Sequence, residues 1–166
     1  MLVSEMTERM VEVVKEARAK IGKDFRIIRG GKRTTEEVVG ATKHTSVNNY
    51  INSANFPLAV LPEEEKELVA FQVDGYDHNP SSDEILLEYK KRGLERPTHE
   101  DALKFDEAYP NEKGIFVFLH EPWLDPDRYL VVLVVFRGEA LRKLYLSWFV
   151  RQWSRHDWFV GARPRK

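Results

Sequence analysis

Aromatic and basic side chains are mixed in the last part of the chain, 143–166, in a pattern suited to binding. Trp148, Trp153 and Trp158 recur at five-residue spacing, with arginine and histidine between them. Rigid aromatics and arginine give large contact energies at a small cost of ordering, and recognition surfaces are enriched in them. The segment is therefore the first candidate for a functional surface.

Side chains of a strand alternate between two faces, so this segment can be divided into buried and exposed positions. We expect Leu144, Leu146 and Trp148 to face the interior, followed by Trp158 and Val160 on the returning strand, with Phe159 outward. The expected ligand-binding residues are Tyr145, Ser147, Phe149, Arg151, Ser154, Arg155, His156 and Asp157. The alternative is a sheet covered on both faces, which would make Phe149 and Phe159 core residues.

Catalytic and metal-binding patterns are absent from the sequence. The five histidines are dispersed and form no HExxH motif, and the chain has no cysteine for a disulfide, a thiolate site or a nucleophile. The sequence therefore predicts a protein that is not an enzyme and holds no cofactor and no metal. A small enzyme whose site is assembled from dispersed His, Asp and Glu residues is the remaining alternative.

Charge is distributed unevenly along the chain. The net charge is −1, but residues 1–33 carry +4, residues 34–136 carry −11 and residues 137–166 carry +6. The basic C-terminal segment either meets an anionic partner or folds onto the acidic part of its own chain. The near-neutral total favours the second interpretation, while a nucleic-acid-binding module stays as the alternative function.

The length of 166 residues predicts a single domain, 1–166. An amphipathic pattern over 4–21 predicts a helix within an N-terminal helical extension, 1–33, before the body, 34–166. The stretch 28–35 contains a glycine pair and predicts a turn, and 34–62 has only a weak pattern. A strand is expected over 67–73.

Two capped helices and four strands are expected in the second half. Ser81 begins a helix that ends near Arg92, and Thr98 begins another that ends before Pro110. The strands are expected at 114–120, 128–136, 142–149 and 157–163, and the second and third form a hairpin. The predicted class is α+β, with helices followed by an antiparallel sheet and a C-terminal hairpin.

The N-terminus lacks the unbroken apolar stretch of a signal peptide. The longest apolar run, Tyr129–Phe136, is too short to span a bilayer. We therefore expect no membrane insertion and, by default, a cytoplasmic protein, while the oligomeric state stays open.

Two short motifs carry a resemblance to a known fold. Arg96-Pro97-Thr98 with Glu100, within "GLERPTHEDALKFDEAYP", and Gly161-Ala162-Arg163 near the end resemble the C-type-lectin-like fold in its formylglycine-generating-enzyme branch. The tail also resembles variable proteins of diversity-generating retroelements in candidate-phylum bacteria and archaea. In that class a reverse transcriptase rewrites the 3′ end of the gene at template adenines, and the fold displays the altered residues.

The resemblance implies a function and a check at the level of codons. Variable codons of that class derive mainly from AAY, from which the eight expected ligand-binding residues are reachable, whereas Trp148, Gln152, Trp153 and Trp158 are not. The catalytic cysteines of the enzyme branch have no counterpart here. The resemblance implies a non-enzymatic ligand-binding protein with a diversified C-terminal surface, segment 143–163, for a macromolecular ligand, most simply a protein.

Overall fold

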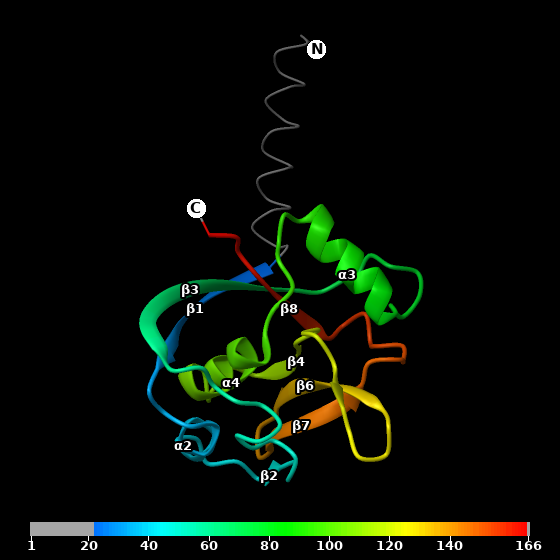
Figure 1. Cartoon of the computed structure of the whole chain (residues 1–166). Coiled ribbons are helices and arrows are strands. Elements are labelled where there is room, and N and C mark those ends of the chain that lie inside the picture. Colours follow the sequence, from blue (N-terminus) through cyan, green and yellow to red (C-terminus); the bar gives the residue numbers. More distant parts are fainter. Residues whose placement is uncertain (1–21, 166) are drawn as a thin grey trace, which may run out of the picture.

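The computed structural model describes residues 22–165, which form one eight-stranded sheet and three helices (Figure 1). The strand order is β1-β3-β8-β4-β6-β7-β2, and β5 pairs with β6. The strands are β1 (Gly22–Gly31), β2 (Ser46–Val47), β3 (Leu61–Phe71), β4 (Gly114–Val117), β5 (Trp123–Leu124), β6 (Leu130–Arg137), β7 (Arg142–Trp148) and β8 (Trp158–Ala162). The helices are α2 (Thr35–Gly40), α3 (Ser82–Lys91) and α4 (His99–Ala108). Within residues 22–165 none of the helices has the length and apolarity to span a membrane.

The two expected helices of the second half are confirmed, together with their start signals. The Ser81 side chain accepts a hydrogen bond from the amide of Glu84, whose carboxylate returns to the Ser81 amide, and α3 follows. Thr98 and Asp101 make the same reciprocal pair at the start of α4. Each box satisfies two amides that the first helical turn leaves without partners.

The strands of the second half are also confirmed, and β6 and β7 form the expected hairpin. Their turn is closed by a hydrogen bond of 2.8 Å from the Gly138 amide to the Leu141 carbonyl. A strand at 67–73 was expected, and β3 covers its first part but begins earlier, at Leu61. The acidic run within β3 therefore lies in a strand.

The prediction that the last two strands, β7 and β8, form a C-terminal hairpin is wrong. β7 and β8 are not neighbours; β8 lies between β3, to which it is antiparallel, and β4, to which it is parallel. Phe159 and Val160 are both fully buried, on opposite faces of β8, as a central strand requires. A second parallel pairing joins β2 to β7, so the sheet is mixed.

The order of helices followed by strands is corrected as well. β1 and β3 precede α3 and α4, and β1 occupies part of the expected helical extension 1–33. Buried Phe25 and Ile27 alternate with exposed neighbours, which is a strand pattern. The body therefore includes residue 22, and the helix expected at 4–21 lies outside the described residues.

Helix α2 was not predicted, because 34–62 has only a weak pattern in the sequence. Thr34 and Glu37 form a capping box, and Val38 is buried against the core. The helix has only six residues, too few for a clear amphipathic period. The segment that follows, up to β3, is mostly without regular structure, as expected.

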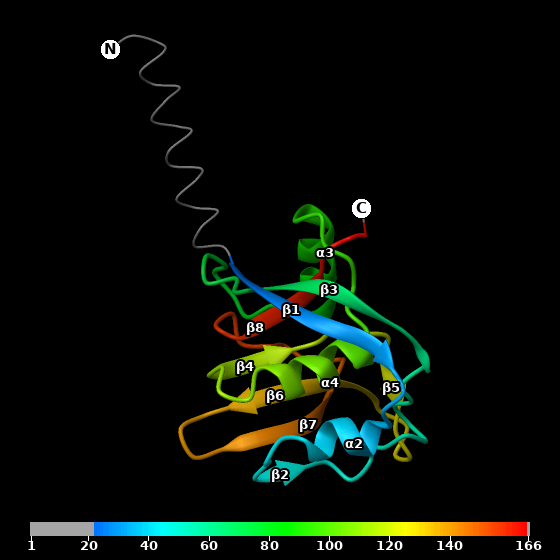
Figure 2. The ribbon, with the colours of Figure 1, turned by 90° about the vertical axis from the view of Figure 1, so that its left-hand side faces the viewer.

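The sheet is covered on both faces, and each face has its own core. Figure 2 shows α4 in front of β4 and β6, with α3 on the other side behind β3. The first core, with α4, contains Phe25, Leu68, Phe105, Phe116 and Val160 among others. The second core, with α3, contains Phe71, Ile85, Tyr89, Trp153 and Phe159 among others. This two-sided burial determines which side chains of the C-terminal segment are free.

Candidate ligand-binding surface

The eight expected ligand-binding residues do not form one exposed face. Arg151 and His156 are exposed. Four others are half-buried: Tyr145, Phe149, Ser154 and Arg155. Ser147 and Asp157 are buried, each with 8% of its surface exposed.

The assignment of faces in β7 and β8 is corrected in part. Leu144 is buried as expected, but Trp148 is 54% exposed and Phe159 is fully buried. Tyr145, expected to face a ligand, packs against the second core. The reason is that α3 and the β7–β8 loop cover the face of the sheet that was expected to be exposed. The alternative, a sheet covered on both faces, is therefore correct for Phe159.

The loop between β7 and β8, residues 149–157, is anchored to the start of α3. Trp153 is 2% exposed, and its indole nitrogen donates to the Ser82 hydroxyl over 2.9 Å. That hydroxyl donates in turn to the Phe149 carbonyl over 2.6 Å, and the Trp153 amide donates to the Pro80 carbonyl over 2.8 Å. The buried indole thus has its donor satisfied, and the first half of the loop is held in one place.

The second half of the loop is held by residues 72–79. The guanidinium of Arg155 donates to the Tyr76 carbonyl over 2.8 Å, and the Arg155 carbonyl accepts from the Val73 amide over 3.1 Å. His156 pairs with the carboxylate of Asp74. Arg155 therefore has an internal role, and its guanidinium is not free for a ligand.

Asp157 and Ser147 also have internal partners. The Asp157 carboxylate accepts from the Ser154 amide over 3.1 Å, and burial raises its pKa above the ordinary value for an aspartate. The Ser147 hydroxyl accepts from the Arg151 guanidinium over 2.7 Å. This contact places Arg151 over the Trp153 ring, 4.6 Å from its centroid.

Large apolar side chains are exposed next to this loop, and sequence reasoning missed most of them. Trp148 stacks on Tyr129, which is 50% exposed, with ring centroids 4.9 Å apart and planes at 25°. Val150 is 81% exposed. We call the exposed set the aromatic patch; its members are Leu124, Tyr129, Leu130, Trp148 and Val150.

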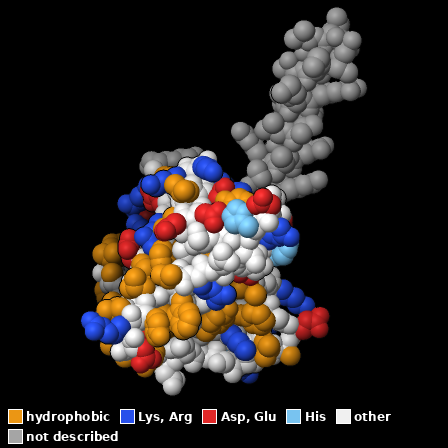
Figure 3. Space-filling view, turned by 90° about the vertical axis from the view of Figure 1, so that its right-hand side faces the viewer, with side chains coloured by type: hydrophobic (Ala, Val, Ile, Leu, Met, Phe, Trp, Pro, Cys, Tyr) orange, Lys and Arg blue, Asp and Glu red, His pale blue; other side chains and the backbone are white. Residues whose placement is uncertain are grey.

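In the sheet, the backbone positions of these residues are close to one another. Leu124 of β5 lies opposite Leu130 of β6, and Trp148 lies opposite Val131. The Phe149 amide donates to the Leu130 carbonyl over 2.8 Å. Figure 3 shows hydrophobic side chains gathered over the lower part of this side of the molecule, with Lys and Arg side chains among them.

One signal in the sequence pointed to two-sided burial. The run 131–135 of β6 is apolar without interruption, and all five of its residues are buried. Uninterrupted apolar strands are typical of sheets covered on both faces. In a sheet covered on both faces, the alternation of residue types in β7 does not show which face is exposed. The exposure of Trp148 then depends on where the covering elements end.

Basic residues of the C-terminal segment pair with acids of the body, as the near-neutral total favoured. Arg137 pairs with Asp106 inside the protein, where both side chains are almost fully buried. Arg163 contacts Asp24 over 2.9 Å and Glu67 over 3.2 Å. Arg165 pairs with Glu64.

Each histidine of the described part has a hydrogen-bonding partner within the protein. His120 is buried, accepts a hydrogen bond of 3.0 Å from the Leu133 amide and contacts the Glu121 carbonyl over 2.7 Å. Burial lowers its pKa to about 4, so the ring is neutral. His44 contacts the Asp106 carboxylate over 2.8 Å. Residues 22–165 contain no group of three or more His, Cys, Asp or Glu side chains arranged to hold a metal ion.

Comparisons with protein-family models, curated proteins and solved structures returned no match.

Proposed function

We propose that this chain is a non-enzymatic binding protein that holds another protein on its aromatic patch and the adjoining loop. The observation that carries the proposal is the exposed stack of Trp148 on Tyr129, next to Val150. Contiguous exposed apolar patches are uncommon on soluble proteins unless a partner covers them. Truncation of such aromatic anchors typically costs about 2–4 kcal/mol of binding free energy.

The anchored loop supports a preorganised surface. Trp153 fixes one half of the loop on α3 and Arg155 fixes the other on residues 72–79. Ordering a loop on binding costs free energy, and a loop that is already ordered avoids that cost. The exposed residue Arg151, which follows Val150, is thereby presented beside the patch.

Charge at the rim of the patch supports a partner with acidic groups around an apolar centre. The Arg151 guanidinium lies over Trp153 and is held by Ser147, so its position is fixed while its edge stays exposed. A fixed arginine beside an apolar patch fits the usual anatomy of protein interfaces, with an apolar core and a polar rim.

The finer fold assignment, C-type-lectin-like, is part of the proposal. It is supported by two capped helices that precede a group of mainly antiparallel strands, and by the places of the two motifs. Arg96 donates to the Leu119 carbonyl over 2.7 Å and the His120 carbonyl over 3.0 Å, just before α4. Gly161 lies in β8, where an added Cβ would approach Tyr89 and Leu94 to within 3.1 and 3.2 Å.

Diversification of the C-terminal surface is proposed on the same motifs. Among the eight expected positions, Arg151 and His156 are exposed and tolerate substitution with the least effect on packing. Val150, reachable from the same codon class, is also exposed and lies in the patch. Sequencing the gene neighbourhood tests this part: a reverse transcriptase and a near-copy of codons 143–163 that differs at adenines are expected, and a locus with neither contradicts it.

The alternative, a nucleic-acid-binding module, has less support. Phosphate contacts require free Lys and Arg side chains, and Arg137, Arg163 and Arg165 are paired with carboxylates. The two readings differ in salt dependence, because release of counterions makes nucleic-acid affinity fall steeply between about 50 and 200 mM salt.

Site-specific photocrosslinking tests the protein-binding proposal. A photoreactive phenylalanine analogue at Tyr129 is expected to yield discrete protein adducts in extract of the native host, and Trp148→Ala is expected to abolish them. The matched control carries Leu87→Ala on α3, because Leu87 is 55% exposed and Trp148 is 54% exposed. Adducts that survive Trp148→Ala, or consist of nucleic acid and vanish at 200 mM salt, contradict the proposal.

A further inference from the structure

Strand β1 is at the end of the sheet order, so one side of its backbone has no neighbouring strand. At two places, side chains from α4 and from Tyr109, which follows it, form hydrogen bonds with the backbone groups on this open side of β1. The Tyr109 hydroxyl accepts from the Arg26 amide and donates to the Arg26 carbonyl, both over 2.8 Å. Glu100 accepts from the Gly30 amide over 3.2 Å, and Lys104 donates to the Gly30 carbonyl over 3.3 Å. Proteins commonly cover strand edges in this way to prevent unwanted pairing.

Ile28 lies midway between these two places and is left open. Backbone groups of alternate residues point to the same side of a strand, so the amide and carbonyl of Ile28 point the same way as those of Arg26 and Gly30. No residue among 22–165 hydrogen-bonds to them on that side. Two α4 residues between Lys104 and Tyr109 line this place: Glu107, which pairs with Arg33, and Ala108, whose methyl group leaves space.

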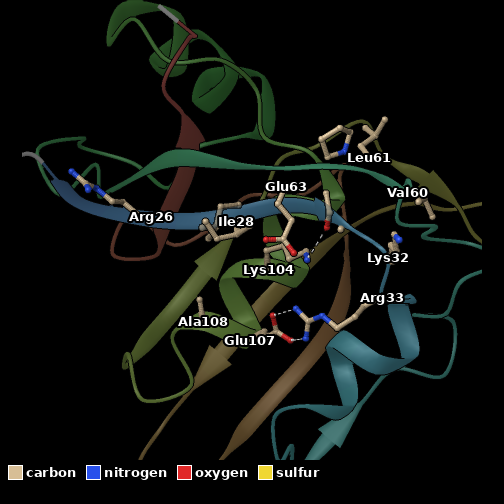
Figure 4. A pocket seen from close by; sticks show the side chains of 14 residues that line it. Arg26, Ile28, Lys32, Arg33, Val60, Leu61, Glu63, Lys104, Glu107 and Ala108 are labelled. Atoms are coloured by element: carbon tan, nitrogen blue, oxygen red, sulfur yellow. Dashed lines mark hydrogen bonds and ion pairs between the residues drawn. The ribbon is translucent and has the colours of Figure 1, made fainter.

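A groove of about 880 Å³ occupies this place, as Figure 4 shows. One wall is apolar and exposed, with Ile28, Val60 and Leu61. Its volume is within the range of sites that bind small ligands and short peptide segments. The groove therefore combines an open backbone donor and acceptor with apolar contact area.

The charged lining of the groove has an excess of cations. Arg26, Lys32, Arg33 and Lys104 contribute four positive charges against two from Glu63 and Glu107. Lys104 is only 6% exposed, and within residues 22–165 no carboxylate lies within 4 Å of its ammonium group. A buried ammonium with a single carbonyl contact has unused hydrogen-bonding capacity directed at the groove.

We propose that this groove binds the C-terminus of an extended peptide. The peptide runs parallel to β1: one of its carbonyls accepts from the Ile28 amide, and the amide two residues later donates to the Ile28 carbonyl. An aliphatic side chain of the peptide packs on Val60 and Leu61, and the terminal carboxylate lies at Lys104 and Lys32. This is strand addition at a sheet edge combined with capture of a terminal carboxylate. The peptide must end at this place because the side chains of Glu100 and Lys104, which bond to the Gly30 backbone, block the strand edge beyond it.

The groove shares no residue with the aromatic patch. The peptide-binding proposal and the protein-binding proposal can therefore fail independently of each other. Titration of isotope-labelled full-length protein with a mixture of N-acetylated pentapeptides tests it, with the last two positions drawn from Val, Leu, Ile and Phe. The same mixture with amidated C-termini is the comparison. We expect the free acids to move the Ile28 amide resonance and to bind about tenfold more tightly than the amides.

Variants assign the effect to the groove. Ala108→Trp fills the space above Ile28 and is expected to abolish binding. Lys104→Met and, as a second variant at an exposed position, Lys32→Met are each expected to weaken binding of the acids toward that of the amides. Lys90→Met on α3 is the matched control, since Lys90 is exposed and distant from the groove, and it is expected to bind as the unmodified protein does.

Four outcomes would overturn the proposal. Equal affinity for acids and amides would show that the terminal carboxylate is not recognised. Binding without a shift of the Ile28 amide resonance would show that the peptide does not pair with β1. Decanoate that binds as tightly as the peptides assigns the groove to apolar acids instead. A dimer in sedimentation that Ala108→Trp dissociates assigns the edge to a second copy of the chain.

Discussion

The indole nitrogen of Trp153 and the hydroxyl of Ser82 lie 2.9 Å apart, and this contact joins the β7–β8 loop to the first turn of α3. The same hydroxyl donates to the Phe149 carbonyl, so one serine holds two points of the loop. The packing of the loop on the second core therefore depends on a small polar contact inside an apolar region.

Ser82→Ala is expected to lower the free energy of unfolding by about 1–3 kcal/mol, because it leaves the buried indole donor and the Phe149 carbonyl without partners. Urea denaturation followed by circular dichroism measures the change. Ser53→Ala is the control, since Ser53 hydrogen-bonds only to the exposed Glu36. Equal stabilities of the two variants would contradict the role given to Ser82.

Arg137→Met is expected to cost about 3–5 kcal/mol of stability, because it leaves the fully buried Asp106 carboxylate without its guanidinium partner. Arg163→Met is the matched control. Its side chain is 48% exposed, and exposed ion pairs contribute only about 0–1 kcal/mol. Similar small effects for both variants would mean that Asp106 is compensated by other groups, with His44 the nearest.

The buried His120 predicts a loss of stability in acid. Its pKa in the folded state is about 4, below the ordinary value of 6.5, so the unfolded chain binds more protons between these values. The contribution is complete above pH 6.5 and decreases as the pH falls to about 4, by roughly 3 kcal/mol in total. Because Asp77 and Glu84 raise the pKa of His78, that residue acts in the opposite direction.

The difference between the unmodified protein and His120→Gln isolates this effect. The free energy of unfolding is measured at several pH values from 4 to 8. The advantage of the unmodified protein is expected to shrink toward acid pH. A difference that is constant over this range would contradict a neutral buried imidazole.

Tryptophan fluorescence distinguishes the observed faces of β7 from the expected ones. Trp148 is 54% exposed and Trp153 only 2%, so acrylamide is expected to quench Trp148 far more strongly. Trp148→Phe should remove the most quenchable, red-shifted part of the emission, and Trp153→Phe should leave it. The reverse result would restore the assignment of Trp148 to the interior.

Gly30→Ala is expected to destabilise the antiparallel pairing of β1 with β3. Gly30 has φ of +82°, and an added Cβ would lie 2.5 Å from the Pro62 carbonyl oxygen. The cost should exceed about 1 kcal/mol, while Gly75→Ala, with open space around its Cα, is expected to change stability little. Thermal unfolding of the two variants gives the comparison, and equal midpoints would contradict the strain at Gly30.

Local signals in the sequence were sufficient for some elements and insufficient for the pairing of strands. Ser81 and Thr98 marked the helix starts because capping depends on residues three positions apart. The position of β8 between β3 and β4 depends on residues some 40 to 90 positions away, which periodicity cannot identify. β1 was not predicted, because 1–33 was assigned to a helical extension and 28–35 to a turn on its glycine pair.

Of the eight residues that the sequence placed on the candidate surface, two are exposed, four are half-buried and two are buried. The mixture of aromatic and basic types pointed to 143–163, and Arg151 and His156 are exposed there. Ser147 and Asp157 are buried because α3 and the loop cover one face of the sheet. Trp148 lies on the opposite face of β7, with Leu144 and Leu146, and is 54% exposed at the end of the strand, which is a property of tertiary packing.

The central place of β8 has a consequence for folding of the protein. The strand that joins β3 to β4 is Trp158–Ala162, which follows the other described strands in the sequence. β1 pairs with β3 and β6 pairs with β7 without it, so these two parts become one sheet only when β8 is inserted between β3 and β4. We expect the loop before β8 to adopt its position at that step, so the candidate surface is completed only after the two parts of the sheet have joined.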